Sequence, residues 1–204
     1  MITIIDYGLG NVLAFHNVYK RLNIPVAVAR TADELNGATR LILPGVGSFD
    51  HAMERLGASG MRARLDELVL EKLLPVLGVC VGMQILAKSS EEGRLQGLGW
   101  VDGRVRHLHG DKPGVKLRLP HMGWNDVSPV GSSGLFAGLE HDARFYFLHS
   151  YCFECERSES MLASSNYGGT FACAVQSRKI LGVQFHPEKS HQWGTRLLKN
   201  FAEV

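Results

Sequence analysis

One cysteine lies where the sequence predicts a junction between a strand and a helix. Cys80 follows the apolar run 74–77 and precedes the apolar residues 85–87, with Gly78 and Gly82 two positions to either side. Glycines permit the sharp turn of a nucleophile elbow, here with sulfur in place of oxygen. A thiol at the start of a helix lies in a field that favours the thiolate, which is the nucleophilic form. The alternative is a buried structural cysteine, and the two glycines favour the nucleophile.

A second stretch could supply the proton acceptor that a cysteine nucleophile requires. His186 ends the strand-like run 180–185 and is followed by Pro187 and Glu188. Residues i and i+2 of an extended chain point to the same side, so this imidazole and this carboxylate can face one site. The carboxylate would fix the tautomer of the imidazole and stabilise its charged form. A loop at a strand end explains the same residues without chemistry, but together with Cys80 they predict a Cys-His-Glu triad.

The elements that would position these residues alternate along the chain. Strand-like apolar runs are separated by segments with helical spacing, and this alternation is typical of a parallel sheet. Strands are predicted at 2–5, 25–29, 40–43, 74–77, 145–151, 161–167, 171–176 and 180–185, and helices at 11–22, 32–36, 49–56, 61–69, from 85 onward and through 193–201. We therefore expect one α/β domain over residues 1–204, with an open, largely parallel central sheet flanked by helices.

Three local features add detail to this prediction. Ser48 can cap the helix at 49–56, and residues 89–92 would close the helix that follows the cysteine. The region 93–114 is rich in glycine and carries several basic residues, including Lys112. We expect this region to form surface β-hairpins, whose basic side chains belong either to a solvated face or to a partner surface.

Composition argues against several classes of function. The formal net charge of +2 on 204 residues gives no argument for nucleic-acid binding. No apolar stretch approaches the ~20 residues that span a bilayer, and the chain opens on a strand without a leader, so a cytoplasmic protein is expected. Cys152 and Cys155 are interpreted as incidental thiols. His107 and His109 lack further metal ligands, and residues 6–11 lack the third glycine of a dinucleotide-binding turn, so no metal or organic cofactor is implied.

Together these stretches resemble those of a known family. Residues 78–84 and 185–188 are similar to the nucleophile and His-Pro-Glu motifs of the class I, or triad, glutamine amidotransferases. Residues 6–11, 44–47 and 120–125 narrow the resemblance to the glutaminase subunits of imidazole glycerol phosphate synthase. The resemblance spans nearly the whole chain, with the motifs in the same order.

The resemblance implies a flavodoxin-like sheet with added β-hairpins and a glutaminase activity. Glutamine would be hydrolysed to glutamate and ammonia by the triad of Cys80, His186 and Glu188. The oxyanion would be bound by backbone N–H groups after a peptide near Val46 turns over. The oxyanion site is expected at Gly45, Val46, Gly47 and Val81, and the glutamine would be bound by Gln84, Glu92, His149, Ser150 and Tyr151.

A glutaminase of this size needs a partner for the ammonia it forms. Free ammonia would be protonated and lost by diffusion, and the chain is too short to hold a second catalytic domain. The resemblance identifies the partner as a (β/α)8-barrel cyclase subunit of histidine biosynthesis, which would form a heterodimer with this chain. The expected interface residues are Asn11, Trp124, Tyr146 and Lys189.

Three other functions remain open at this point. Related glutaminase subunits supply ammonia to barrel partners that aminate or amidinate sugars of surface polysaccharides. A thiol peptidase of similar fold is disfavoured by Gln84 and by the stretch around Trp124. A non-catalytic, partner-binding subunit is disfavoured by the intact triad.

Overall fold

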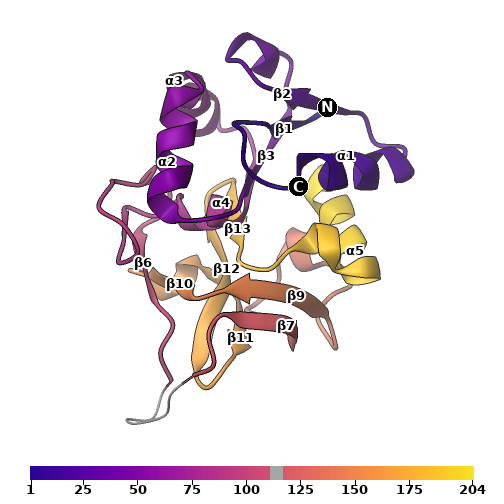
Figure 1. Ribbon diagram of the computed structural model, residues 1–204. Coiled ribbons are helices and arrows are strands. Elements are labelled where there is room, and N and C mark those ends of the chain that lie inside the picture. The colour runs from indigo at the N-terminus through magenta and orange to yellow at the C-terminus, as the bar shows by residue number, and fades with distance from the viewer. Residues whose placement is uncertain (111–116) are drawn as a thin grey trace.

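The protein is built around one large sheet and a separate pair of strands (Figure 1). The computed structural model describes residues 1–110 and 117–204. The strands are β1 (Ile2–Ile5), β2 (Val26–Ala29), β3 (Arg40–Gly45), β4 (Val76–Cys80), β5 (Ser89–Ser90), β6 (Gly103–His107), β7 (His121–Asp126), β8 (Ser128–Pro129), β9 (Arg144–His149), β10 (Tyr151–Cys155), β11 (Met161–Asn166), β12 (Thr170–Ser177) and β13 (Ile180–Val183). The α-helices are α1 (Val12–Arg21), α2 (Phe49–Ala58), α3 (Arg62–Asp66), α4 (Val81–Gln84) and α5 (His191–Glu203), and a 3₁₀ turn, η5 (Pro187–Lys189), precedes α5.

One half of the large sheet is parallel. Strands β2, β1, β3, β4 and β13 lie in this order and run parallel, as in flavodoxin-like sheets. Beyond β13, strands β12, β10 and β6 pair antiparallel, and β11 pairs with β12 and β8. The small sheet consists of β7 and β9. The predicted open α/β sheet with added β-hairpins is confirmed, and its parallel strands are concentrated in the half that carries Cys80.

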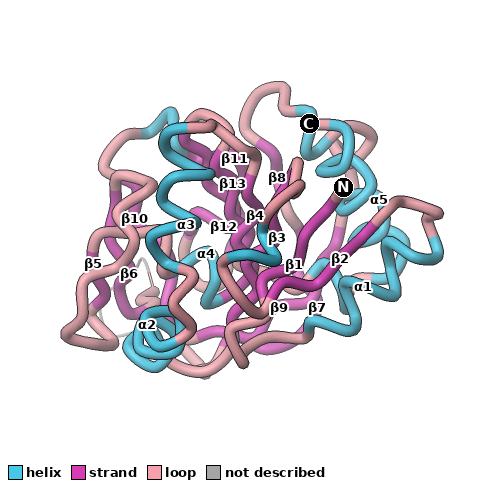
Figure 2. The backbone as a smooth tube through the Cα atoms, turned by 90° about the horizontal axis from the view of Figure 1, so that it is seen from above, coloured by secondary structure: helices cyan, strands magenta, loops and turns pink. Residues whose placement is uncertain are grey.

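Helices cover both faces of the parallel half. Figure 2 shows α2 and α3 on one side of the sheet and α1 and α5 on the other. The buried residues are Phe49, Ala52, Met53 and Leu56 on α2, and Gly194, Leu197, Leu198, Asn200 and Phe201 on α5. The apolar ones recur at the i, i+3, i+4, i+7 spacing, so one stripe of each helix packs on the sheet. Each large apolar side chain buried there contributes about 1.5–3 kcal/mol.

The prediction of surface hairpins between 93 and 114 was wrong for the described residues. Strand β6 belongs to the large sheet, where it pairs with β10 and with β5. Its buried Val105 alternates with Arg104 and Arg106, which are exposed and form ion pairs with Glu154 on β10. The basic side chains are therefore the outer face of a half-buried strand. Lys112 lies outside the described residues.

The helix after Cys80 is shorter than predicted. It ends at Gln84, and residues 89–90 form β5 instead of closing a helix. The carbonyls of Ile85 and Ala87 accept hydrogen bonds from the N–H groups of residues 98 and 99, which come from a different part of the chain. These bonds replace the helical pattern.

Other helix details also differ from the sequence prediction. Ser48 precedes α2 without a side-chain hydrogen bond, and the Glu92 carboxylate accepts the Phe49 N–H at 2.8 Å instead. The predicted helix at 61–69 is divided into α3 and a π-helical turn, and the one at 32–36 is a single 3₁₀ turn. Within the described residues, no helix is both long and apolar enough to cross a membrane.

Candidate active site

Cys80 occupies the sharp turn that the sequence predicts between a strand and a helix. It is the last residue of β4, and its backbone has φ 56° and ψ −115°, a conformation that costs a non-glycine residue about 1–3 kcal/mol. The flanking glycines are required by close backbone contacts. A Cβ on Gly78 would lie 2.6 Å from the Gly82 carbonyl oxygen, and a Cβ on Gly82 would lie 1.9 Å from the Leu43 carbonyl oxygen. Neighbouring backbone therefore holds the elbow on both sides.

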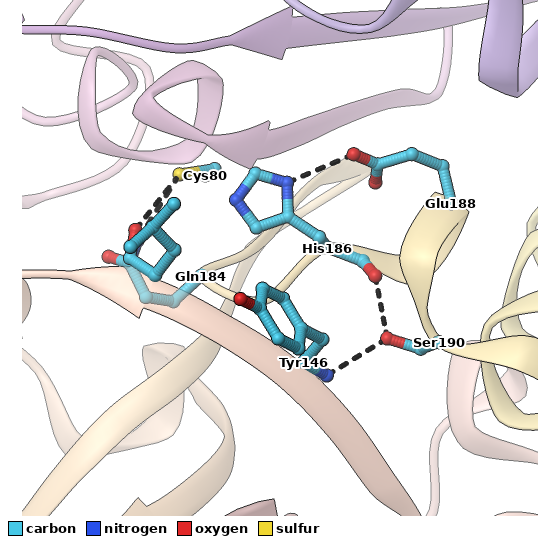
Figure 3. A network of polar contacts seen from close by, with 7 residues as sticks. Cys80, Tyr146, Gln184, His186, Glu188 and Ser190 are labelled. Atoms are coloured by element: carbon cyan, nitrogen blue, oxygen red, sulfur yellow. Dashed lines mark hydrogen bonds and ion pairs between the residues drawn. The ribbon is translucent and has the colours of Figure 1, made fainter. Parts of the chain in front are cut away.

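His186 and Glu188 form the rest of the predicted triad geometry. The imidazole Nδ1 lies 3.0 Å from the Glu188 Oε1, and both side chains are buried. Figure 3 shows the imidazole between Cys80 and Glu188. Burial lowers the pKa of His186, but its hydrogen bonds and charge interactions with Cys80 and Glu188 outweigh burial and raise that pKa to about 9. The arrangement therefore favours an imidazolium beside the Cys80 sulfur near neutral pH.

Backbone contacts hold His186 in place. Its N–H donates to the Tyr146 carbonyl at 2.9 Å, and its own carbonyl accepts from the Ser190 hydroxyl at 2.6 Å. The same hydroxyl oxygen accepts the Tyr146 N–H at 3.0 Å (Figure 3). Ser190 thus joins β9 to the turn that carries the triad imidazole. Sequence reasoning missed it, and its position two residues after the His-Pro-Glu motif is the signal that could have identified it.

A cavity of about 320 Å³ brings the predicted site residues together. Its lining comprises Val46, Gly47, Cys80, Val81, Gln84, Glu92, Pro120, Leu148, His149, Ser150, Tyr151, His186 and Lys189. All five residues expected to bind glutamine are in this set. Gly45, Glu188, Asn11, Trp124 and Tyr146 are outside the lining. The cavity lies at the carboxyl ends of β3 and β4, where open α/β sheets bind their ligands.

The loop after β3 is anchored at its base and exposed at its tip. Gly45 pairs with Cys80 across the sheet, and a Cβ there would lie 2.3 Å from the Gly82 nitrogen. The buried Tyr7 hydroxyl donates to the Pro44 carbonyl at 2.8 Å. Val46, one residue further, is exposed and lines the cavity. The loop therefore places exposed peptide groups beside the nucleophile.

The ring nitrogens of His149 are both engaged within the protein. Nδ1 lies 2.8 Å from the Tyr151 carbonyl, which can only accept, so Nδ1 carries the proton. Nε2 must then accept from His121 Nδ1, 2.9 Å away. Burial lowers the pKa of His149 to about 3 and that of His121 to about 4, so both imidazoles are neutral. His149 lines the cavity, but neither ring nitrogen is available to a ligand.

The predicted interface residues are close to the cavity but on the outer surface. Trp124 on β7 and Tyr146 on β9 are directly opposite each other, as are Met122 and Leu148. We call these four residues the β7–β9 face. The Trp124 indole also stacks on the His191 ring, with centroids 5.3 Å apart. The Leu148 carbonyl lies 3.9 Å from the Cys80 Sγ, so one strand extends from this face to the nucleophile.

The remaining expected residues of the interface lie on other elements. Asn11 is exposed at the start of α1, just beyond the carboxyl end of β1. Lys189 lies in η5 and lines the cavity. Among the described residues, no cluster of three or more His, Cys, Asp and Glu side chains has the geometry to hold a metal. Burial raises the pKa of Cys152 and of Cys155 to about 11, which makes both poor nucleophiles at neutral pH.

Comparison with known proteins agrees with this geometry. The sequence model of the family described as glutamine amidotransferase class-I matches residues 3–204. A solved glutamine amidotransferase has a TM-score of 0.76 at 23% identity, and PurLQS from Thermotoga maritima has a TM-score of 0.70 at 15% identity. Each comparison covers 99% of this chain and 97% of the other. The chain is a class I glutamine amidotransferase.

Curated relatives narrow this assignment. The imidazole glycerol phosphate synthase subunit HisH of Bdellovibrio bacteriovorus is 66% identical over 205 residues, and that of Leptospira interrogans is 52% identical over 204 residues. Each alignment covers 100% of this chain and 100% of the relative. Within class I, the chain belongs to the family of HisH subunits of imidazole glycerol phosphate synthase. This membership opposes the thiol-peptidase alternative.

Proposed function

We propose that the protein hydrolyses glutamine to glutamate and ammonia in the cavity that contains Cys80 and His186, as the glutaminase subunit of imidazole glycerol phosphate synthase. Membership of the class I and HisH families supports this activity. The observation that carries the site assignment is the cavity itself, which joins the thiol and the imidazole to all five residues expected to bind glutamine. The continuous sheet beneath it supports a single amidotransferase domain over residues 1–204.

The triad performs the reaction in two steps. The Cys80 thiolate attacks the carboxamide carbon, and the oxyanion accepts hydrogen bonds from the backbone N–H of Val81 and from a peptide in the Gly45–Gly47 loop. The His186 imidazolium donates its proton to the departing ammonia, which leaves a thioester and a neutral imidazole. The imidazole then takes a proton from water as the hydroxide attacks the thioester, and glutamate leaves. Glu188 keeps the imidazole oriented throughout.

The polar groups of the cavity suit the amino-acid end of glutamine. Both N–H groups of Gln84 are used within the protein, by the Tyr151 carbonyl and by Gln184, so its oxygen remains to accept from the substrate. Glu92 uses one oxygen to accept the Phe49 N–H and can pair with the substrate α-ammonium through the other. Ser150 and Tyr151 complete the wall of the cavity.

The ammonia is proposed to pass to a (β/α)8-barrel cyclase subunit. The HisH relatives are named as subunits, which implies a second subunit for this chain. The β7–β9 face, with Asn11 and Lys189, is the proposed contact surface because it is exposed, partly aromatic and next to the cavity. A cytoplasmic location is part of the same proposal, and the four free thiols support it.

The decisive experiment measures glutamine hydrolysis by the chain alone, and then with a histidine-pathway cyclase subunit and its ribonucleotide ligand. Cys80→Ala serves as the blank. We expect weak hydrolysis by the chain alone and strong stimulation by the complex, both absent in the blank, because the oxyanion loop requires reordering. Hydrolysis without stimulation would move the chain to another ammonia acceptor. Absence of hydrolysis under every condition would overturn the glutaminase proposal.

A further inference from the structure

A buried amide outside the triad is directed at the nucleophile. Gln184 follows β13 directly and has no solvent-exposed surface. Its Nε2 lies 3.9 Å from the Cys80 Sγ, within the range of a hydrogen bond to sulfur (Figure 3). A glutamine side chain is fully buried only at a cost unless its polar atoms are paired. The hydrogen-bond partners of the Gln184 amide therefore indicate what this side chain does.

The orientation of the Gln184 amide is fixed by a second amide. Its Oε1 accepts from the Gln84 Nε2 at 3.0 Å, and Gln84 uses its other N–H for the Tyr151 carbonyl at 3.2 Å. If the Gln184 amide flipped, two N–H groups would face each other and the Cys80 sulfur would face an oxygen. The observed arrangement is thus the one that presents a donor to sulfur.

A thiolate at Cys80 needs such a donor because few other groups stabilise a negative charge on the sulfur. Cys80 is buried, and helix α4 spans four residues, so few aligned peptide dipoles point at the sulfur. The Leu148 carbonyl oxygen, 3.9 Å from Sγ, disfavours negative charge. The buried Tyr7 phenol stays protonated because burial and the charge of Cys80 raise its pKa. Among the described residues, the favourable groups in contact with the sulfur are the His186 imidazolium, itself paired with Glu188, and the Gln184 amide. Lys189 and Glu92, which line the same cavity, carry opposite charges.

We propose that Gln184 is a positioning residue of the glutaminase site, which stabilises the Cys80 thiolate and orients the Gln84 amide toward the substrate. The proposal rests on the proposed function, since it assigns a role within the same reaction. One side chain would thereby link the nucleophile to a substrate-binding group. Loss of Gln184 should therefore raise the pH at which the Cys80 thiol ionises and lower the rate of glutamine turnover.

The test replaces Gln184 by methionine, which has a similar shape and cannot donate. We expect the pH midpoint of Cys80 alkylation by iodoacetamide, followed by mass spectrometry of the Cys80 peptide, to rise by about one pH unit in Gln184→Met. The kcat for glutamine should fall about tenfold near neutral pH. The matched control is Gln176→Met on β12, whose side chain donates to the Arg178 carbonyl. This control should leave both measurements unchanged.

The outcomes separate this inference from the function on which it rests. If wild-type protein hydrolyses glutamine but Gln184→Met keeps the wild-type alkylation midpoint, the positioning role is overturned and the glutaminase assignment stands. If wild-type protein with its partner does not hydrolyse glutamine, the proposed function is overturned, and the role of Gln184 in that reaction is overturned with it. A second measurement tests the role of Gln184 even if Gln184→Met does not fold. In wild-type protein, the Gln184 side-chain amide resonances should shift as Cys80 ionises, and a signal without that shift would also overturn the role.

Discussion

At the scale of single residues, the triad imidazole couples the stability of the protein to pH. Burial lowers the pKa of His186, yet its bonds to Cys80 and Glu188 raise it from the ordinary 6.5 to about 9. A group with a raised folded-state pKa stabilises fully below its unfolded pKa and loses that contribution as pH rises through its folded pKa. We therefore expect the contribution of His186 to the free energy of unfolding to fall between pH 6.5 and pH 9, with the His186 ring resonances titrating in the same window.

The control for this prediction is Glu188→Gln. The neutral amide keeps the shape of the side chain but cannot stabilise the imidazolium, so the decrease with pH should be smaller. The same variant should hydrolyse glutamine about 10–100 times more slowly, because the imidazole is no longer oriented by a carboxylate. His186 ring resonances that titrate near pH 6.5 in the wild-type protein would contradict the raised pKa.

The backbone of Cys80 predicts an unusual order of stability among inactive variants. Its positive φ suits glycine better than any residue with a Cβ. We expect Cys80→Gly to exceed Cys80→Ala in free energy of unfolding by about 1 kcal/mol, because both lose the thiol contacts and only glycine relieves the strain. Urea unfolding of the two purified variants measures the difference. Equal stability would show that the turn tolerates a Cβ without cost.

Residue-scale predictions from sequence depend on local signals, and the catalytic roles they assign stay predictions. Two short motifs carry the predicted triad, one with Cys80 and the other with His186 and Glu188. The structure places the three side chains together. Gln184 was missed because its partner Gln84 is 100 residues away in the chain. The role of His149 was only partly predicted, because burial keeps its imidazole neutral and its Nε2 is used by His121, which comes from another strand.

At the scale of elements, the contact between β3 and α4 depends on a residue without a side chain. A Cβ on Gly82 would lie 1.9 Å from the backbone oxygen of Leu43, which cannot move without breaking the sheet. We expect Gly82→Ala to lower the free energy of unfolding by about 2–3 kcal/mol. Chemical denaturation, supported by a thermal melt, measures this effect.

The matched control is Gly57→Ala in α2, where a Cβ meets no atom within 4 Å. This exposed helical position should gain about 0.5–1 kcal/mol from the higher helix propensity of alanine. Opposite signs for the two substitutions are therefore expected. A loss of stability in both, or in neither, would contradict the account of the elbow.

The same contacts explain which elements the sequence predicted well. Continuous apolar runs fixed the parallel strands, because both faces of β1, β3 and β4 are buried. Strand β6 was mistaken for surface hairpins because Arg104 and Arg106 find their carboxylate, Glu154, on a strand some fifty residues later. The helix after Cys80 was drawn too long because apolar residues 85–87 are equally buried in the irregular segment they form.

At the scale of the whole molecule, substitutions on the β7–β9 face and on the surface beyond the amino end of β4 should differ in their effect on the proposed partner. Met122, on the β7–β9 face, is 64% exposed, and Leu70, beyond the amino end of β4, is 45% exposed. We expect Met122→Lys to weaken binding of the proposed cyclase partner about tenfold or more, since it would place a charge in the proposed contact surface. Isothermal titration calorimetry with the purified subunit measures the affinity.

The control here is Leu70→Lys, which adds the same charge beyond the amino end of β4 and should leave the affinity unchanged. Both variants should keep the basal hydrolysis of the free chain, because neither residue lines the cavity. Equal weakening by the two substitutions would indicate a general charge effect. Unchanged binding in Met122→Lys would remove the β7–β9 face from the interface.

The strained turn at Cys80 also has a genetic consequence. Both cysteine codons, TGT and TGC, become glycine codons when the first base changes from T to G. We expect such a mutation to abolish the reaction and to yield a more stable polypeptide than alanine at the same position would. Purifying selection on this base therefore comes chiefly from the chemistry, since the turn itself accepts glycine. In a gene copy kept only for its partner-binding role, this base should be among the first to change.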